Sequence, residues 1–284
     1  MLTVENVPMS NRRELIWPLL AASLWGGMYV VSGLTFARIP PITLGLARLL
    51  IGVAVLALVL RRLPHLRDVR LAGLGALLAG TLMLQFWGTF LAGAAAGSLL
   101  TMLTPVFVAV LAPLVLHEST RSRQWAGIAV AFIGAAVIVG GRTGPSLLGD
   151  LLLVGASVTW GAYTVLGAPL VRRLGALEIT LGASLWAIPA MLPGTVVELA
   201  TGRHLELGLG AVLGALYLGV LATALAWWAW YRGVERLPAV TVAVFFLAQP
   251  VVGVALSIPI FHFPLTAGFV VGSVLVIAGM LLAT

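Results

Sequence analysis

The sequence predicts an all-α integral membrane protein in which ten transmembrane helices form two inverted five-helix repeats. Three observations lead to this prediction: the composition, the arginines between apolar runs, and features that recur at a near-constant offset. Of the 284 residues, 61% are apolar and 9% are charged, whereas soluble domains usually carry about a quarter charged residues. A bilayer explains this balance, because a spanning helix needs roughly 20 mostly apolar residues.

Ten apolar runs follow one another along the chain. They cover residues 16–34, 42–60, 71–91, 94–115, 125–140, 150–168, 177–199, 207–230, 238–260 and 265–283. Each is long enough to cross a bilayer as a helix. The first run is long for the core of a signal peptide, so we expect it to be retained as a helix.

The arginines test the number of spans, because cytoplasmic loops carry an excess of positive charge. With ten spans and a cytoplasmic N-terminus, twelve arginines fall inside, three fall outside, and Arg48 lies within a span. Losing one span would reverse every later loop and abolish this bias. We therefore expect a multi-pass protein of the bacterial inner membrane with both termini cytoplasmic. The net charge of +7 is then a topology signal, and no nucleic-acid partner is expected.

The two halves of the sequence repeat. A shift of 145 residues brings Pro105 onto Pro250, and a shift near 136 brings Trp25-Gly26 onto Trp160-Gly161. Each repeat holds an odd number of helices, so the second must be inverted relative to the first, as in many secondary transporters. The predicted divisions are a cytoplasmic segment 1–15, a first repeat 16–140, an external linker 141–149 and a second repeat 150–284.

Short motifs occur along nearly the whole chain. They are Ala22 to Gly26, Ala47 to Leu50, Thr104-Pro105, His117-Glu118, Ala156 to Tyr163 and Gln249-Pro250, with the glycines Gly127, Gly134, Gly272 and Gly279. Together they resemble the EamA branch of the drug/metabolite transporter superfamily. His262-Phe263 departs from the Gly-Glu pair with which that family often closes its ninth helix. The aromatic content is most similar to that of YddG-type exporters of aromatic amino acids.

The midspan prolines Pro105 and Pro250 mark the expected substrate site. Proline removes a helical hydrogen bond and displaces the carbonyl four residues earlier, here the carbonyls of Thr101 and Phe246. Such groups are tolerated at membrane depth only beside protein or a polar cavity. The polar residue directly before each proline could line this cavity. A kinked packing helix is the alternative explanation.

Aromatic residues predict the walls of the same cavity. Trp25, Trp160 and Trp186 fall near mid-depth, where an indole N–H needs a hydrogen-bond partner. Aromatic walls with a few amides suit flat apolar ligands, and tight helix packing is the alternative. The expected substrate-binding residues are Trp25, Tyr29, Gln85, Trp87, Thr101, Thr104, Pro105, Trp160, Tyr163, Phe245, Phe246, Gln249 and Pro250.

Three charged residues are expected to have gating or structural roles. Arg48 lies inside a span, where a charge is a functional candidate by default. It could reach outward, pair with Glu198, or contact a substrate carboxylate. Glu118 is expected to stabilise the N-terminus of the helix that follows it. The remaining tryptophans toward the cytoplasmic side are expected to be interface anchors: Trp17, Trp125, Trp227, Trp228 and Trp230.

No catalytic or metal-binding set is evident. Cysteine is absent, the four histidines fall in loops or at span ends, and no phosphate-binding loop motif occurs. A channel would need more hydroxyl or charged faces along its pore. The sequence favours a secondary transporter that exports small apolar metabolites, above all aromatic and other hydrophobic amino acids, by alternating access around a midplane cavity. Export of other drugs or metabolites stays open, and an intramembrane enzyme is the alternative from another class. Besides the bilayer and a small-molecule substrate, no cofactor and no obligate protein partner are expected.

Overall fold

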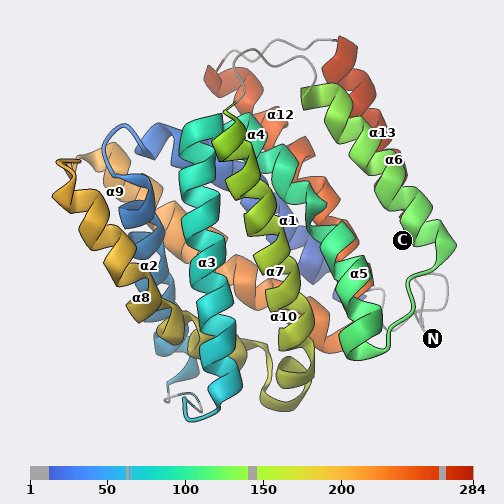
Figure 1. The fold of residues 1–284 in the computed structure, drawn as a ribbon, viewed down its shortest axis with the longest axis horizontal. Coiled ribbons are helices and arrows are strands. Elements are labelled where there is room, and N and C mark those ends of the chain that lie inside the picture. The colour runs from blue at the N-terminus through green and yellow to red at the C-terminus, as the bar shows by residue number, and fades with distance from the viewer. Residues whose placement is uncertain (1–12, 62–63, 65, 140–145, 262–266, 284) are drawn as a thin grey trace.

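The structure is a computed structural model that describes residues 13–61, 64, 66–139, 146–261 and 267–283 (Figure 1). Regular structure in this part of the chain is helical throughout. Seven of its helices are long and apolar enough to cross a membrane. Most of the predicted segment 1–15, most of the linker 141–149, and His262-Phe263 lie outside the described residues.

The helices follow the predicted apolar runs. The first half contains α1 (Ile16–Thr35), α2 (Pro41–Leu60), α3 (Val69–Ala92), α4 (Ala94–Leu100), α5 (Thr104–Leu116) and α6 (Ser122–Val139). The second half contains α7 (Leu147–Leu174), α8 (Ala176–Ala200), α9 (Leu209–Leu216), α10 (Ala226–Arg236), α11 (Ala239–Val244), α12 (Gln249–Phe261) and α13 (Ala267–Ala283).

Three pairs of these helices continue into one another through a rewound segment. The 3-10 segment η2 (Thr101–Leu103) joins α4 to α5, and the 3-10 segment η4 (Phe245–Ala248) joins α11 to α12. The π-helical segment η3 (Tyr217–Leu225) joins α9 to α10. With these joins, the described residues form ten continuous helical segments.

The packing of the helices pairs the two halves. α1 contacts α10 and α12, whereas α7 contacts α3 and α5; α2 contacts α8, and α6 contacts α13. In Figure 1, α3 and α7 lie side by side near the centre, and α6 and α13 form a pair at one edge. Exchanging the segments of one half for those of the other, in order, maps this set of contacts onto itself.

Close approach of the helices depends on glycine. A Cβ at Gly26 would lie 2.6 Å from the carbonyl oxygen of Gln249 and 2.9 Å from the backbone nitrogen of Gly253, so α1 and α12 are nearly in backbone contact. A Cβ at Gly279 would lie 2.5 Å from the carbonyl oxygen of Gly127. The glycines of α6 and α13 therefore permit close packing, and the packing partner belongs to the same chain.

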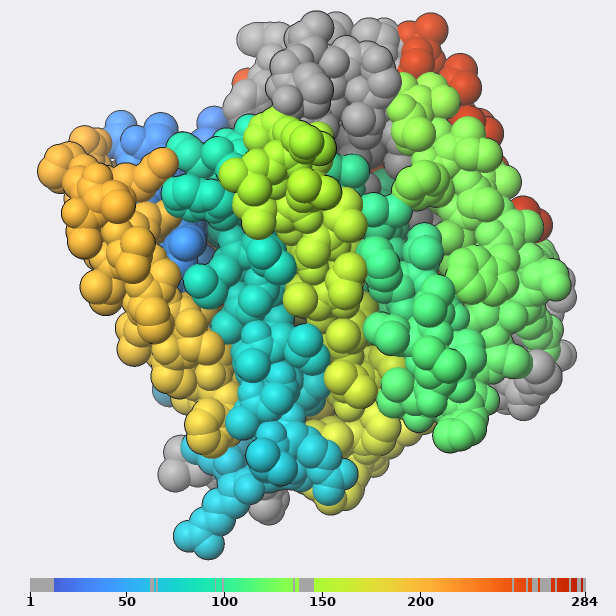
Figure 2. Space-filling view, viewed as in Figure 1, coloured from blue at the N-terminus to red at the C-terminus, as the bar shows by residue number. Residues whose placement is uncertain are grey.

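The outer faces of the helices are apolar. Figure 2 shows α8, α3, α7, α5 and α6 following one another across one face of the molecule. Large exposed side chains on this set of helices include Val196, Leu151, Leu114 and Ile133. Soluble monomers rarely expose extended apolar patches, whereas helices in contact with lipid do so throughout.

The glycine contact between α1 and α12 gives a stability prediction. Gly26→Ala should lower the free energy of unfolding by roughly 1–3 kcal/mol, because the added methyl meets backbone atoms that cannot turn aside. Gly73→Ala is the matched control, since nothing lies within 4 Å of its Cβ position, and it should be neutral or stabilising by up to about 1 kcal/mol. Thermal unfolding of the purified protein measures both, and equal shifts would contradict this packing.

Candidate functional site

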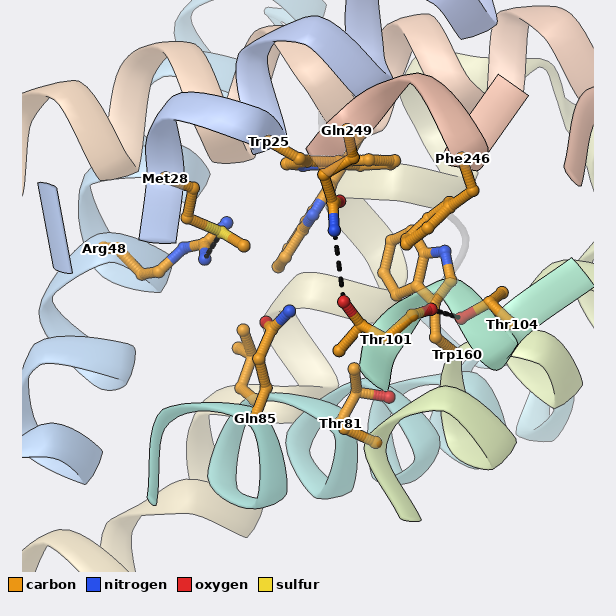
Figure 3. Close-up of a pocket in the computed structure, with 13 residues that line it drawn as sticks. Trp25, Met28, Arg48, Thr81, Gln85, Thr101, Thr104, Trp160, Phe246 and Gln249 are labelled. Carbon is orange, nitrogen blue, oxygen red and sulfur yellow. Dashed lines mark hydrogen bonds between the residues drawn. The ribbon is translucent and has the colours of Figure 1, made fainter. Parts of the chain in front are cut away.

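A small buried cavity lies where α1, α2, α3, α7 and α10 meet the two 3-10 segments (Figure 3). Its volume is about 20 Å³, enough for about one water molecule. Pockets for small-molecule ligands usually measure roughly 300–1,000 Å³, so a metabolite can enter only if the helices move apart. The predicted residues that line the cavity are Trp25, Gln85, Thr101, Thr104, Trp160, Phe246 and Gln249.

The backbone is rewound just before both midspan prolines. At the first break, the backbone N–H of Thr104 donates to the carbonyl of Thr101, and the Thr104 hydroxyl donates to the same carbonyl at 2.8 Å. At the second break, the N–H of Gln249 donates to the carbonyl of Phe246. The residue before each proline thus supplies a donor for the carbonyl that the proline displaces.

A hydrogen-bond network centred on Thr101 borders the cavity. The Thr101 hydroxyl donates to the carbonyl of Gly97 at 2.7 Å, and it accepts from Gln249 Nε2 at 3.1 Å. It lies 2.8 Å from the hydroxyl of Tyr29, which must be the donor because the single proton of Thr101 is already used. Gln85 Nε2 donates to Tyr29 at 2.6 Å. The network joins α1, α3, η2 and α12.

Two polar atoms of the cavity wall have no hydrogen-bond partner among the described residues: Gln249 Oε1 and Trp160 Nε1. Gln249 Nε2 donates to the carbonyl of Ser98 at 3.4 Å and to Thr101. Rotating the amide would set its oxygen against the carbonyl oxygen of Ser98, so the network fixes its orientation. A buried unpaired polar group costs about 1–3 kcal/mol, which makes both atoms favourable contacts for a ligand.

Arg48 places a positive charge on the cavity wall although its side chain is only 1% exposed. Its Nε donates to the hydroxyl of Thr223 at 2.7 Å, and its Nη2 donates to the carbonyl of Ala222 at 2.8 Å. Its Nη1 faces Met28 Sδ at 2.7 Å, and the ring of Trp227 lies 5.5 Å from Cζ. Within the described residues no carboxylate pairs with this guanidinium.

The two glutamates assigned gating or structural roles hold helix N-termini. Glu198 accepts the backbone N–H of Thr43 at 2.7 Å, at the start of α2, so the pairing with Arg48 considered from the sequence is not formed. Glu118 accepts the N–H of Ala239 at 2.9 Å, at the start of α11. The hydrogen bonds of this carboxylate go to α11 and to Arg172, and the expected effect on the helix that follows it directly stays a prediction. Each carboxylate offsets the positive end of a helix and ties together segments distant in sequence.

The two tryptophans matched by the sequence repeat meet at the cavity. The ring centroids of Trp25 and Trp160 lie 5.3 Å apart in an edge-to-face arrangement. Phe246 lies 5.3 Å from Trp25, and Trp25 Nε1 donates to the carbonyl of Ala222 at 2.9 Å, the same oxygen that Arg48 contacts. The wall opposite Arg48 is therefore mostly π surface (Figure 3).

Six predicted binding residues lie behind the cavity wall or away from it: Tyr29, Trp87, Pro105, Tyr163, Phe245 and Pro250. Tyr29 orients Thr101 and Gln85, and Tyr163 packs on Trp160 with ring centroids 5.1 Å apart. Trp87 lies under the guanidinium of Arg203, 5.0 Å from its ring centroid. Trp186, expected near mid-depth, is 39% exposed and donates to the carbonyl of Leu66 at 3.2 Å.

Five further lining residues were not predicted: Met28, Thr81, Leu82, Ala156 and Trp227. Trp227 was assigned to the interface because the predicted run ended at residue 230, but α10 continues to Arg236. Trp227 is buried at the cavity wall, and Trp230 is buried close by, with its ring centroid 5.3 Å from that of Trp25. The spacing of three residues between Trp227 and Trp230 was the available signal, because it places both on one helix face.

Polar contacts hold both ends of the bundle. At the end where α3 begins, Arg173 pairs with Asp68 at 2.5 Å and Arg172 pairs with Glu118 at 2.9 Å. At the opposite end, the guanidinium of Arg203 stacks on two aromatic rings of α3, at 5.0 and 4.7 Å from their centroids. These contacts join loops and helix ends at the two ends of the bundle.

A family model described as the EamA-like transporter family matches residues 12–140 and again residues 147–284. The chain belongs to this family. EamA-like proteins are multi-pass membrane transporters, so this chain is a transporter and not an enzyme. A crystal structure 21% identical to this EamA-like chain matches its fold with a TM-score of 0.79 over 96% of both chains.

Several curated relatives carry names that refer to amino acids. A Streptantibioticus cattleyicolor protein, described as a probable terminal-alkyne amino-acid exporter, is 32% identical over 94% of this chain and 87% of its own. Proteins of Salmonella typhimurium and Escherichia coli, each described as a probable amino-acid metabolite efflux pump, are 26% and 25% identical. Each aligns with 95% of this chain and 94% of its own length.

The Thr101 network gives a second stability prediction. Thr101→Val should lower the free energy of unfolding by about 1–3 kcal/mol for each donor it leaves unpaired, those of Tyr29 and Gln249. Thr101→Ser keeps the hydroxyl and should stay close to the parent protein. Chemical or thermal unfolding in detergent compares the two variants. A valine variant as stable as the serine variant would show that the network does not contribute to the free energy of unfolding.

Proposed function

We propose that this EamA-like transporter exports small apolar metabolites, above all aromatic and other hydrophobic amino acids, by alternating access around the buried cavity. One observation carries the proposal: an aromatic cavity with a few oriented polar groups lies where two proline-broken helices meet. Binding sites of secondary transporters typically lie at such discontinuous helices near the bilayer midplane. The names of the relatives support amino acids as the substrate class.

We take the ten helical segments to be ten spans, arranged as two inverted five-helix repeats with the cavity between them. The contacts that map onto themselves when the halves are exchanged support this arrangement. So does the meeting of Trp25 with Trp160, which the sequence repeat relates. The excess of arginine in alternate loops supports cytoplasmic termini in a bacterial inner membrane.

The balance of forces in such a cavity favours apolar amino acids. A ligand that moves from water to this wall gains roughly 25 cal/mol per Å² of apolar area buried. Stacking on aromatic rings adds about 0.5–1.5 kcal/mol. An additional unpaired charge costs more than these gains, so aspartate, lysine and sugar phosphates should be excluded.

Transport by variants of the aromatic wall tests the proposed function. In proteoliposomes the parent protein should move phenylalanine, tryptophan and leucine. Trp25→Ala and Trp160→Ala should reduce phenylalanine transport by roughly 10-fold, more than threonine transport, because they remove stacking area. Trp125→Ala is the matched control, since Trp125 is exposed on α6. Unchanged phenylalanine transport in both wall variants would place the substrate elsewhere.

Cysteine labelling tests the topology, because the parent chain has no cysteine. A single cysteine at Ser119, in the exposed loop after α5, should react with an impermeant reagent only from the cytoplasmic side. A single cysteine at His204, in the exposed loop after α8, should react only from the outside. The reverse pattern would overturn the proposed orientation, and labelling of both from one side would overturn the proposed number of spans.

A further inference from the structure

The cation of Arg48 lacks a protein counter-ion in the part of the chain that the structure describes. A guanidinium has five N–H donors and keeps its charge in proteins. Each of its nitrogens makes one contact, to Thr223, Met28 and Ala222, so one N–H on Nη1 and one on Nη2 remain. These partners are neutral. Buried charges normally pair with an opposite charge, and an arginine on a cavity wall offers a forked donor that matches a carboxylate.

The amide oxygen of Gln249 provides the complementary group. Gln249 is fully buried, and its amide nitrogen donates to Ser98 and Thr101. Its amide oxygen Oε1 then accepts from no donor among the described residues. An oriented carbonyl oxygen of this kind accepts from an ammonium group without adding a negative charge. It would therefore suit a zwitterion, whereas a carboxylate at this place would favour a simple amine.

The order of these groups matches the order of groups in an α-amino acid. In Figure 3, Arg48 lies on one side of the cavity, the amide of Gln249 lies between, and Trp160 with Phe246 lies on the other side. We infer that the cavity recognises the zwitterionic head group, with Arg48 binding the α-carboxylate and Gln249 Oε1 accepting from the α-ammonium. The side chain of the substrate then points toward Trp160 and Phe246. This inference rests on the proposed function and narrows it: a free carboxylate is required.

A structural role for Arg48 is the competing explanation, because its three contacts tie α2 to α1 and η3. Such a role predicts loss of folded protein when Arg48 is replaced, with no dependence on the chemistry of the ligand. Head-group recognition predicts discrimination among ligands by the parent protein itself. The decisive measurement therefore needs no variant at all.

The test measures how strongly different ligands inhibit phenylalanine transport by the parent protein in proteoliposomes. Phenethylamine lacks the carboxylate, phenylalaninamide replaces it with a neutral amide, and 3-phenylpropanoate lacks the ammonium. The first two should inhibit on the order of 100-fold more weakly than unlabelled tryptophan, because the buried guanidinium then stays unpaired. 3-Phenylpropanoate should inhibit more strongly than phenethylamine. Equal inhibition by phenethylamine and tryptophan would overturn the inference and leave the proposed function standing.

Replacement of the cation is the second arm of the experiment. Arg48→Gln should reduce phenylalanine transport on the order of 100-fold. Its thermal unfolding should still show a folded protein. Arg38→Gln, which removes an exposed arginine, should transport as the parent does. An Arg48→Gln protein that transports normally would overturn the inference. If the parent itself transports no amino acid of the panel, the proposed function fails, and this inference fails with it.

Discussion

A polar backbone group inside the hydrocarbon region must find its hydrogen-bond partner within the protein, and the architecture of this chain depends on that constraint. The helices depart from α geometry at η2, η3 and η4; η2 and η4 contribute residues to the cavity wall, and η3 is bonded to the wall residues Arg48 and Trp25. At η4 the backbone N–H of Gln249 donates to the carbonyl of Phe246, and at η2 and η3 side chains bond the backbone carbonyls. Thr104 donates to the carbonyl of Thr101, and Arg48 and Trp25 both donate to that of Ala222. Breaks in helical hydrogen bonding are unfavourable in the membrane, and they are also the positions where polar atoms can face a substrate.

Duplication explains why these irregularities gather at one place. Pro105 and Pro250 occupy matched positions in the two halves, and the contacts of the segments map onto themselves when the halves are exchanged. Two equivalent breaks therefore approach each other across the centre, with Trp25 and Trp160 in contact between them. Their partners need not remain equivalent: Trp25 Nε1 is bonded to Ala222, whereas Trp160 Nε1 has no partner among the described residues. The helix contacts of the two halves therefore correspond, whereas the hydrogen bonds of the matched tryptophans in the cavity wall differ.

The helices could be predicted from the sequence because hydropathy in a membrane protein reports the length of a span directly. The two 3-10 segments could be anticipated from Pro105 and Pro250, whereas the π-helical segment η3 contains no proline and was not anticipated. Local patterns could not place a residue where a helix runs past its apolar run, as α10 does, so Trp227 was missed at the cavity. They also could not show that Trp186 faces outward and bonds to the carbonyl of Leu66 rather than lining the cavity. Contacts between segments distant in sequence could not be predicted from local patterns either. The carboxylate of Glu118 bonds to the start of α11 because of how the helices pack. No spacing in the sequence around Glu118 indicates this contact.

The composition of the cavity wall implies an unequal selectivity. Aromatic and aliphatic surfaces discriminate weakly between ligands, by about 1–3 kcal/mol for a methylene group, whereas a polar group left unpaired in a buried site discriminates strongly. Trp25, Trp160 and Phe246 would therefore accept side chains of different size, because each adds area without a directional demand. In the proposed binding mode Arg48 and Gln249 would impose directional demands, because a ligand that fails to pair with them leaves buried polar groups without a partner. If the cavity is the substrate site as proposed, it would be tolerant of the side chain and strict about the head group, a combination suited to a transporter that handles a class of related metabolites.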